Sequence, residues 1–133
     1  MNVEHFALNV ADPAAMAAWY EQHLGCRIVR HGGPPAHAHF VADTGGNVML
    51  EIYRNPPDQV PDYRAMIPLL LHVAFVSEDP AADKARLLAA GASPAEEARL
   101  PDGSHIVTLR DPWGLCIQLC KRGTPLLARA TPA

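Results

Sequence analysis

Four side chains that can bind a metal or move a proton stand at a repeating spacing in this chain. They are His5 and Glu51 in the first half and His72 and Gln118 in the second, and 72 − 5 and 118 − 51 both equal 67. Divalent transition metals accept two imidazoles and a carboxylate as ligands, and an amide oxygen is a weaker fourth ligand. The four positions therefore predict a site for one divalent metal, with open positions for water or substrate.

The segments around these residues repeat at the same spacing. Residues 5–13 (HFALNVADP) reappear as residues 72–80 (HVAFVSEDP), and residues 48–54 (VMLEIYR) reappear as residues 115–121 (LCIQLCK). Two matching segments at one offset are improbable by chance, although strand–Asp-Pro–helix junctions are common. The sequence therefore indicates an internal duplication.

Each copy predicts the same order of elements, one strand, one helix and three further strands. In the first copy residues 3–10 alternate as in a half-buried strand. Asp12 and Pro13 then start a helix, and Gly25 stops it. The other expected elements are strands at 26–31, 37–42 and 47–54, then a strand at 69–77, a helix opened by 79–80 and ended by Gly91, and strands at 93–98, 104–110 and 115–121. We expect an α+β fold of two tandem βαβββ modules, residues 1–54 and 69–122, with a connection at 55–68 and a flexible tail at 123–133.

Strand alternation separates the four candidate ligands from the apolar residues of their strands. In each strand one face is apolar and suits a covering helix, while His5, Glu51, His72 and Gln118 lie on the other. A charged Glu51 inside an apolar strand is costly unless something pairs with it. One explanation is that the histidines are edge residues hydrogen-bonded to Glu51. The symmetric set of four favours a metal site.

Five further residues are weaker candidates for substrate contact. Two of them follow Glu51 and Gln118 by two positions on the same face, two are histidines of neighbouring strands, and one is an arginine of the connection that could clamp a carboxylate or phosphate. These candidates are Tyr53, Cys120, His39, His105 and Arg64.

Composition limits the classes of partner. The chain has 133 residues, of which 49% are hydrophobic and 19% charged, and its formal net charge is −3. No basic run or series of stacking aromatics is present, which argues against nucleic acid and membrane partners and favours a small-molecule substrate. Three cysteines without a Cys-x-x-Cys pair and no visible secretory signal favour a reducing compartment, and we expect a cytoplasmic protein.

Local motifs add a resemblance to a known family. His5 stands in the first strand, residues 19–25 (WYEQHLG) end the first helix, and residues 111–114 (DPWG) precede the last strand. Together with the repeat, these features resemble the vicinal oxygen chelate superfamily, which includes glyoxalase I, bleomycin-binding proteins and extradiol dioxygenases. The layout is most similar to small glyoxalase I-like proteins. The resemblance implies a cup-shaped mixed sheet with helices on its outer face, one divalent metal (Ni, Zn, Co, Mn or Fe) and a homodimer.

One departure from that family bears on the reaction. Metal-dependent members mostly carry Glu in the last strand, where this chain has Gln118, and an amide cannot accept a proton at neutral pH. Glu51 is the counterpart of Gln118 in the first copy and can take over as ligand and catalytic base. The resemblance then implies a lyase or isomerase that chelates vicinal oxygens and stabilises an enediolate-like intermediate. The alternatives are a non-haem iron ring-cleavage dioxygenase and a non-catalytic binding or resistance protein.

Overall fold

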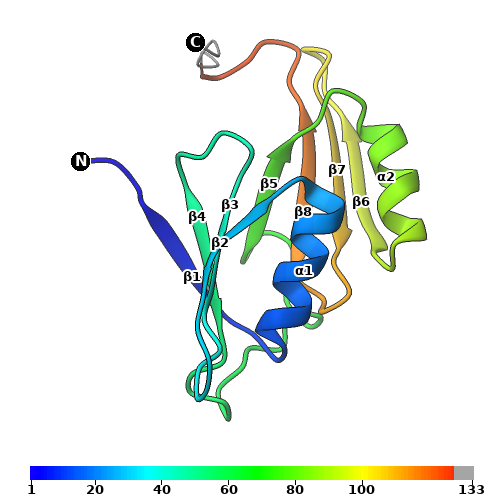
Figure 1. Cartoon of the computed structure of the whole chain (residues 1–133). Helices are drawn as coiled ribbons and strands as arrows, with labels where there is room; N and C mark the ends of the chain where they lie inside the picture. Colours follow the sequence, from blue (N-terminus) through cyan, green and yellow to red (C-terminus); the bar gives the residue numbers. More distant parts are fainter. Residues whose placement is uncertain (128–133) are drawn as a thin grey trace. The chain divides into compact units, whose positions relative to one another are not determined.

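The computed structural model describes residues 1–127, which divide into two compact units, residues 1–62 and 63–127. Each unit contains one helix and one four-stranded sheet, and the elements follow the predicted order (Figure 1). The first unit contains β1 (His5–Asn9), α1 (Pro13–Leu24), β2 (Arg27–His31), β3 (His39–Ala42) and β4 (Met49–Tyr53). The second contains β5 (His72–Val76), α2 (Pro80–Ala89), β6 (Ser93–Arg99), β7 (His105–Arg110) and β8 (Cys116–Lys121). The α+β fold of two βαβββ modules is therefore confirmed.

The two sheets have the same topology, and their parallel strand pairs have the same register. Their strand orders are β1-β4-β3-β2 and β5-β8-β7-β6, with the first pair parallel and the others antiparallel. His5 of β1 lies opposite Met49 of β4, and His72 of β5 lies opposite Cys116 of β8. Both pairs are related by a shift of 67 residues. The duplication read from the sequence thus extends to the register of the parallel strand pairs, while the pairing of β7 with β8 is shifted by one residue relative to that of β3 with β4.

Both helices start in the way that the Asp-Pro dipeptides predict. The carboxylate of Asp12 accepts a hydrogen bond from the N–H of Ala15 at 3.1 Å, and Asp79 does the same for Ala82 at 3.1 Å. Each cap satisfies one of the N–H groups that a helix start leaves unpaired. Helix α1 ends at Gly25, whose φ of 69° is a left-handed conformation that glycine adopts without steric cost.

The core of each unit lies between the helix and one face of the sheet. In the first unit, α1 contacts β2, β3 and β4, and Met16 and Tyr20 are fully buried together with Val41 and Ile52 of the sheet. In the second, α2 contacts β7 and β8, and the buried side chains include Leu87, Val107, Leu109 and Ile117. We call the opposite face of each sheet its site face.

The connection between the modules is held at both of its ends. The side chain of Asn9 donates to the carbonyls of Pro56 at 2.9 Å and Gln59 at 3.2 Å, within the first unit. In the second unit the guanidinium of Arg110 donates to the carbonyls of Tyr63 at 3.0 Å and of Met66 at 2.8 Å. Each half of the connection is thereby fixed to its own sheet.

The predicted tail falls partly outside the described residues. Residues 123–127 contain no helix or strand, and the N–H of Gly123 donates to the hydroxyl of Ser104 at 3.0 Å. Residues 128–133 lie outside the described range. None of the helices in the described part of the chain is long and apolar enough to cross a membrane.

Candidate metal centre

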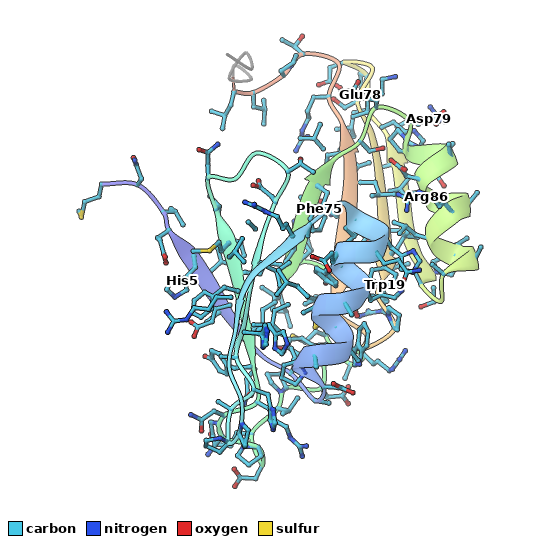
Figure 2. The ribbon with its side chains drawn as sticks, viewed as in Figure 1. His5, Trp19, Phe75, Glu78, Asp79 and Arg86 are labelled. Carbon is cyan, nitrogen blue, oxygen red and sulfur yellow. The ribbon has the colours of Figure 1, made fainter. Side chains whose placement is uncertain are left out.

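The first unit brings two of the four predicted ligands together. His5 of β1 and Glu51 of β4 stand on adjacent parallel strands, and Nε2 of His5 lies 3.2 Å from Oε2 of Glu51 (Figure 2 labels His5). Their side chains retain 37% and 23% of their accessible surface, so both are reachable by a ligand. The sequence indicated that the charged Glu51 needs a partner in its apolar strand, and His5 is that partner.

The second nitrogen of each candidate histidine has a hydrogen-bond partner. Nδ1 of His5 contacts the carboxylate of Glu4, and Nδ1 of His72 lies 2.8 Å from the carbonyl oxygen of Pro68, to which it donates. A metal-binding histidine commonly uses one ring nitrogen in this way, which fixes the ring and leaves the other nitrogen for the metal. The other ring nitrogen is Nε2 in both units, and in His5 it faces the carboxylate of Glu51.

The same contacts act on the charge of His5. The hydrogen bond that His5 donates to Glu4 raises the pKa of His5 above its ordinary value of 6.5, and the charges of Glu4 and Glu51 add to the effect, while partial burial opposes it. A metal ion must compete with the proton that this environment favours.

The donor atoms of the first unit fit a transition metal. Two atoms that each lie about 2.1 Å from one ion are roughly 3.0 to 3.4 Å apart at octahedral or tetrahedral angles. The separation of 3.2 Å between His5 Nε2 and Glu51 Oε2 falls in that range. Within residues 1–127 no three His, Cys, Asp or Glu side chains gather as a metal-binding cluster, so this pair does not by itself make a complete metal site.

The second unit holds the other two predicted ligands on its own site face. Gln118 of β8 lies opposite Ala74 of β5, just as Glu51 lies opposite Ala7, and His72 is two residues before Ala74. The thiol of Cys120 is 3.9 Å from Oε1 of Gln118. Burial raises the pKa of Cys120, so this thiol stays protonated at neutral pH and is an uncharged neighbour of Gln118.

The weaker substrate-contact candidates divide between the two faces. Tyr53 and Cys120 follow Glu51 and Gln118 on the site faces, as predicted. His39 lies opposite Ile52, whose side chain is fully buried, and therefore faces the helix side of its sheet. The guanidinium of Arg64 donates a hydrogen bond to the carbonyl of Pro112, so it is engaged within the second unit.

His105 also lies on the helix side. Thr108 pairs with Gln118 on the site face, and His105 is three positions away in a regular strand, so it points to the other face. Its Nε2 lies 2.8 Å from Oε1 of Glu97, and Lys84 donates to the other oxygen of Glu97 at 2.6 Å. These bonds, from Lys84 first and then His105, lower the pKa of Glu97 to about 2. His105 therefore belongs to an ionic network that joins β6, β7 and α2.

The sequence interpretation missed Phe40. This residue of β3 lies opposite Glu51, and its ring meets the His5 imidazole edge-on, with the ring centroids 5.9 Å apart. It forms an apolar wall beside the two donor atoms. Counting back from Glu51 across the short connection between the expected strands at 37–42 and 47–54 would have indicated it, because a hairpin connection fixes the pairing of the strands it joins.

A family model described as a glyoxalase-like domain matches residues 5–120. The chain belongs to this family. The match spans both units and all four predicted ligands, and it confirms the resemblance to the vicinal oxygen chelate superfamily. The comparison with curated proteins finds no match to this glyoxalase-like chain.

Solved structures with the same fold carry different functions. An antibiotic binding protein, TnmS3 from Streptomyces sp. CB03234, aligns with a TM-score of 0.72 at 22% identity, over 92% of this chain and 96% of that one. The protein SMU.1112c aligns at 0.70 and 27% identity, over 91% and 98% of the two chains. A lactoylglutathione lyase from Agrobacterium tumefaciens aligns at 0.65 and 23% identity, over 89% and 91%. The glyoxalase-like fold is therefore shared by binders and enzymes.

Proposed function

We propose that this glyoxalase-like protein is a divalent-metal-dependent enzyme of the lyase or isomerase type, acting on a small molecule with two adjacent oxygen atoms. The proposed metal ligands are His5 and Glu51 in the first unit and His72 and Gln118 in the second. The observation that carries the proposal is the His5–Glu51 pair, in which Nε2 and Oε2 stand 3.2 Å apart on one sheet face. The Nδ1 partners of both histidines support it, because they fix each ring and make Nε2 the nitrogen that a metal would use.

Glu51 is the proposed base. Its carboxylate is part-exposed beside the edge of the sheet, where it can take a proton from a substrate carbon and return it to the adjacent one. A bound divalent metal would supply Lewis-acid polarisation of the two substrate oxygens. Phe40, which lies opposite Glu51 in the sheet, adds an apolar surface on the same face. The amide of Gln118 would orient the substrate without accepting a proton.

Metal analysis tests the proposal. The protein, purified without added metal, is reconstituted separately with Ni, Co, Zn, Mn and Fe(II), dialysed and measured for metal per chain. We expect about one metal per site in the wild type and loss of binding in His5→Ala and Glu51→Ala. Asp58→Ala, which removes an exposed loop carboxylate of the same unit, should bind metal normally. Failure of the wild type to take up any of these metals would refute the proposal.

The identity of the metal and the substrate then separates the enzyme classes. Turnover of a thiol hemithioacetal with Ni, Co or Zn supports the lyase. Oxygen-dependent cleavage of a catechol with Fe(II) would show a dioxygenase instead, since two histidines and one carboxylate also suit non-haem iron. Cross-linking and sedimentation would test the expected homodimer.

A binding or resistance protein is the second candidate, and one cavity favours it. A cavity of about 640 Å³ lies in the second unit beside the ends of β5 and β8, and its lining includes Phe75, Val76, Cys120, Leu126 and Leu127. Its size and mostly apolar side chains suit a drug-sized molecule, and TnmS3 shows that an antibiotic binder has this fold. A binder of this kind would keep its ligand affinity after treatment with a chelator, whereas the proposed enzyme would lose it.

A further inference from the structure

A β-bulge in β2, the edge strand of the first unit, brings Arg30 to the same face of the sheet as Arg27. Ile28 of β2 pairs with Val41 of β3, and Arg30 pairs with Phe40, so one residue of β2 is left without an opposite partner between them. In a regular strand Arg27 and Arg30, three positions apart, would point to opposite faces. An extra residue reverses the alternation beyond it and re-aims the side chains that follow.

Strand pairing then places both arginines on the site face. Arg27 lies opposite Ala42, which in turn lies opposite Met49, and Arg30 lies opposite Phe40, which lies opposite Glu51. Residues directly opposite one another in antiparallel strands share a face. Since neighbouring strands are about 4.8 Å apart, the Cα of Arg30 stands about 10 Å from that of Glu51.

A chain of contacts connects Arg30 to the proposed ligands. The guanidinium carbon of Arg30 lies 5.9 Å from the centroid of the Phe40 ring, the Phe40 ring meets His5 edge-on, and His5 contacts Glu51. Within residues 1–127 no carboxylate forms an ion pair with Arg27 or Arg30. The planar guanidinium group can hold a carboxylate or phosphate through two parallel hydrogen bonds.

The second unit keeps the bulge but not the charge. Its register shifts between Pro94 and Glu96 of β6, and Glu96 lies opposite Thr108, which lies opposite Gln118. Glu96 is thus aligned with Gln118 across the sheet in the same way that Arg30 is aligned with Glu51 in the first unit, but its charge is negative. The basic side chains therefore occur only in the first unit, on the sheet face that carries Glu51, and are not repeated at these positions of the second unit.

We propose that Arg30, assisted by Arg27, is a specificity-determining residue that holds an anionic oxyacid group of the substrate. Phe40 packs against the part of the substrate between that group and the chelated oxygens. The substrate is accordingly an acid that carries two adjacent oxygen atoms at one end and a carboxylate or phosphate at the other. This inference rests on the proposed function, because it assigns a substrate class to the same site.

The test compares matched probes on zinc-loaded protein. The probes are 3-(3,4-dihydroxyphenyl)propanoate, its methyl ester and the corresponding phosphonate, whose catechol oxygens serve as the chelating pair. Titration calorimetry should show that the wild type binds the acid or the phosphonate at least about tenfold more tightly than the ester. The tighter of the two anions identifies the natural group.

Variants assign the effect to the named residues. Arg30→Gln should weaken anion binding about tenfold and leave ester binding within about twofold, while Arg30→Lys should restore part of the loss. Arg27→Gln should have a smaller effect in the same direction. Arg99→Gln, which removes the same charge from the helix side of β6, should change neither probe.

The two hypotheses fail in different ways. If the wild type takes up zinc and binds the ester as tightly as both anions, the assignment of Arg30 is wrong and the metal site stands. An equal loss in Arg99→Gln and Arg30→Gln would also overturn it, because a general charge effect would then explain the preference. If the protein takes up no metal and binds no probe, the proposed function fails and this inference fails with it.

Discussion

Replacing Asp111 with alanine should destabilise the second unit substantially. The Asp111 side chain is 1% exposed, and its Oδ1 accepts hydrogen bonds from the N–H groups of Trp113 at 2.9 Å and Leu115 at 3.0 Å. Those bonds shape the turn that begins β8, the strand of Gln118. Gly114 completes the turn at a φ of 94°, where a Cβ would come within 2.3 Å of Arg64.

The magnitude follows from the two donors that the substitution leaves unpaired. A buried N–H without an acceptor costs about 1 to 3 kcal/mol. The N–H of Leu115 is fully buried and that of Trp113 is part-buried, so we expect Asp111→Ala to lower the free energy of unfolding by about 2 to 4 kcal/mol. That is a large share of the stability of an ordinary domain, which is about 5 to 15 kcal/mol.

The two tryptophans allow each unit to be followed separately. Trp19 lies on α1 in the first unit (Figure 2) and Trp113 lies in the second, and the chain has no others. Urea unfolding of a Trp19→Phe background, read by Trp113 fluorescence, should show the full loss in Asp111→Ala. Asp111→Asn keeps an oxygen acceptor and should lose only about 1 kcal/mol. Equal unfolding midpoints for the alanine and wild-type proteins would refute this account of the turn, as would an asparagine variant that is as unstable as alanine.

Three further predictions concern substitutions that change the charge of one side chain. Glu4→Gln removes the carboxylate that holds Nδ1 of His5 and should weaken metal affinity about 10- to 100-fold, measured by competition with a chromophoric chelator. Gln118→Glu should strengthen metal affinity in the same assay, because it restores a second carboxylate at the duplicated position. Glu97→Gln should lower the urea midpoint at pH 7, where Lys84 pairs with the ionised group. Since the pKa of Glu97 is about 2 in the folded protein and 4.5 ordinarily, this difference should shrink as the pH falls from 4.5 toward 2.

The order of elements could be predicted because its signals are local. Asp12 and Asp79 cap the helices through bonds to residues three positions later, and strand alternation depends only on neighbouring residues. The same alternation placed His5 and Glu51 on one face, and the offset of 67 aligned the parallel strand pairs of the two sheets. Local capping and internal repetition were thus sufficient for the fold and for half of the candidate site.

The remaining site residues depend on pairing between strands, which one strand's sequence does not encode. His39 and His105 were expected near the substrate, but their partners across β3–β4 and β7–β8 place them on the helix sides. Arg30 was missed because the bulge in β2 reverses the alternation within that strand, and no glycine marks it. Register and bulges therefore decide which polar side chains reach the site.

An anomalous-scattering measurement on crystals grown with cobalt or nickel tests the central claim most directly. Data collected above and below the absorption edge of the metal locate the ion without reference to activity. The proposed centre predicts a peak about 2.1 Å from both Nε2 of His5 and Oε2 of Glu51, with the Nδ1 contact to Glu4 retained. Fully loaded protein with no peak beside this pair, or with its ion bound elsewhere on the chain, would contradict the claim.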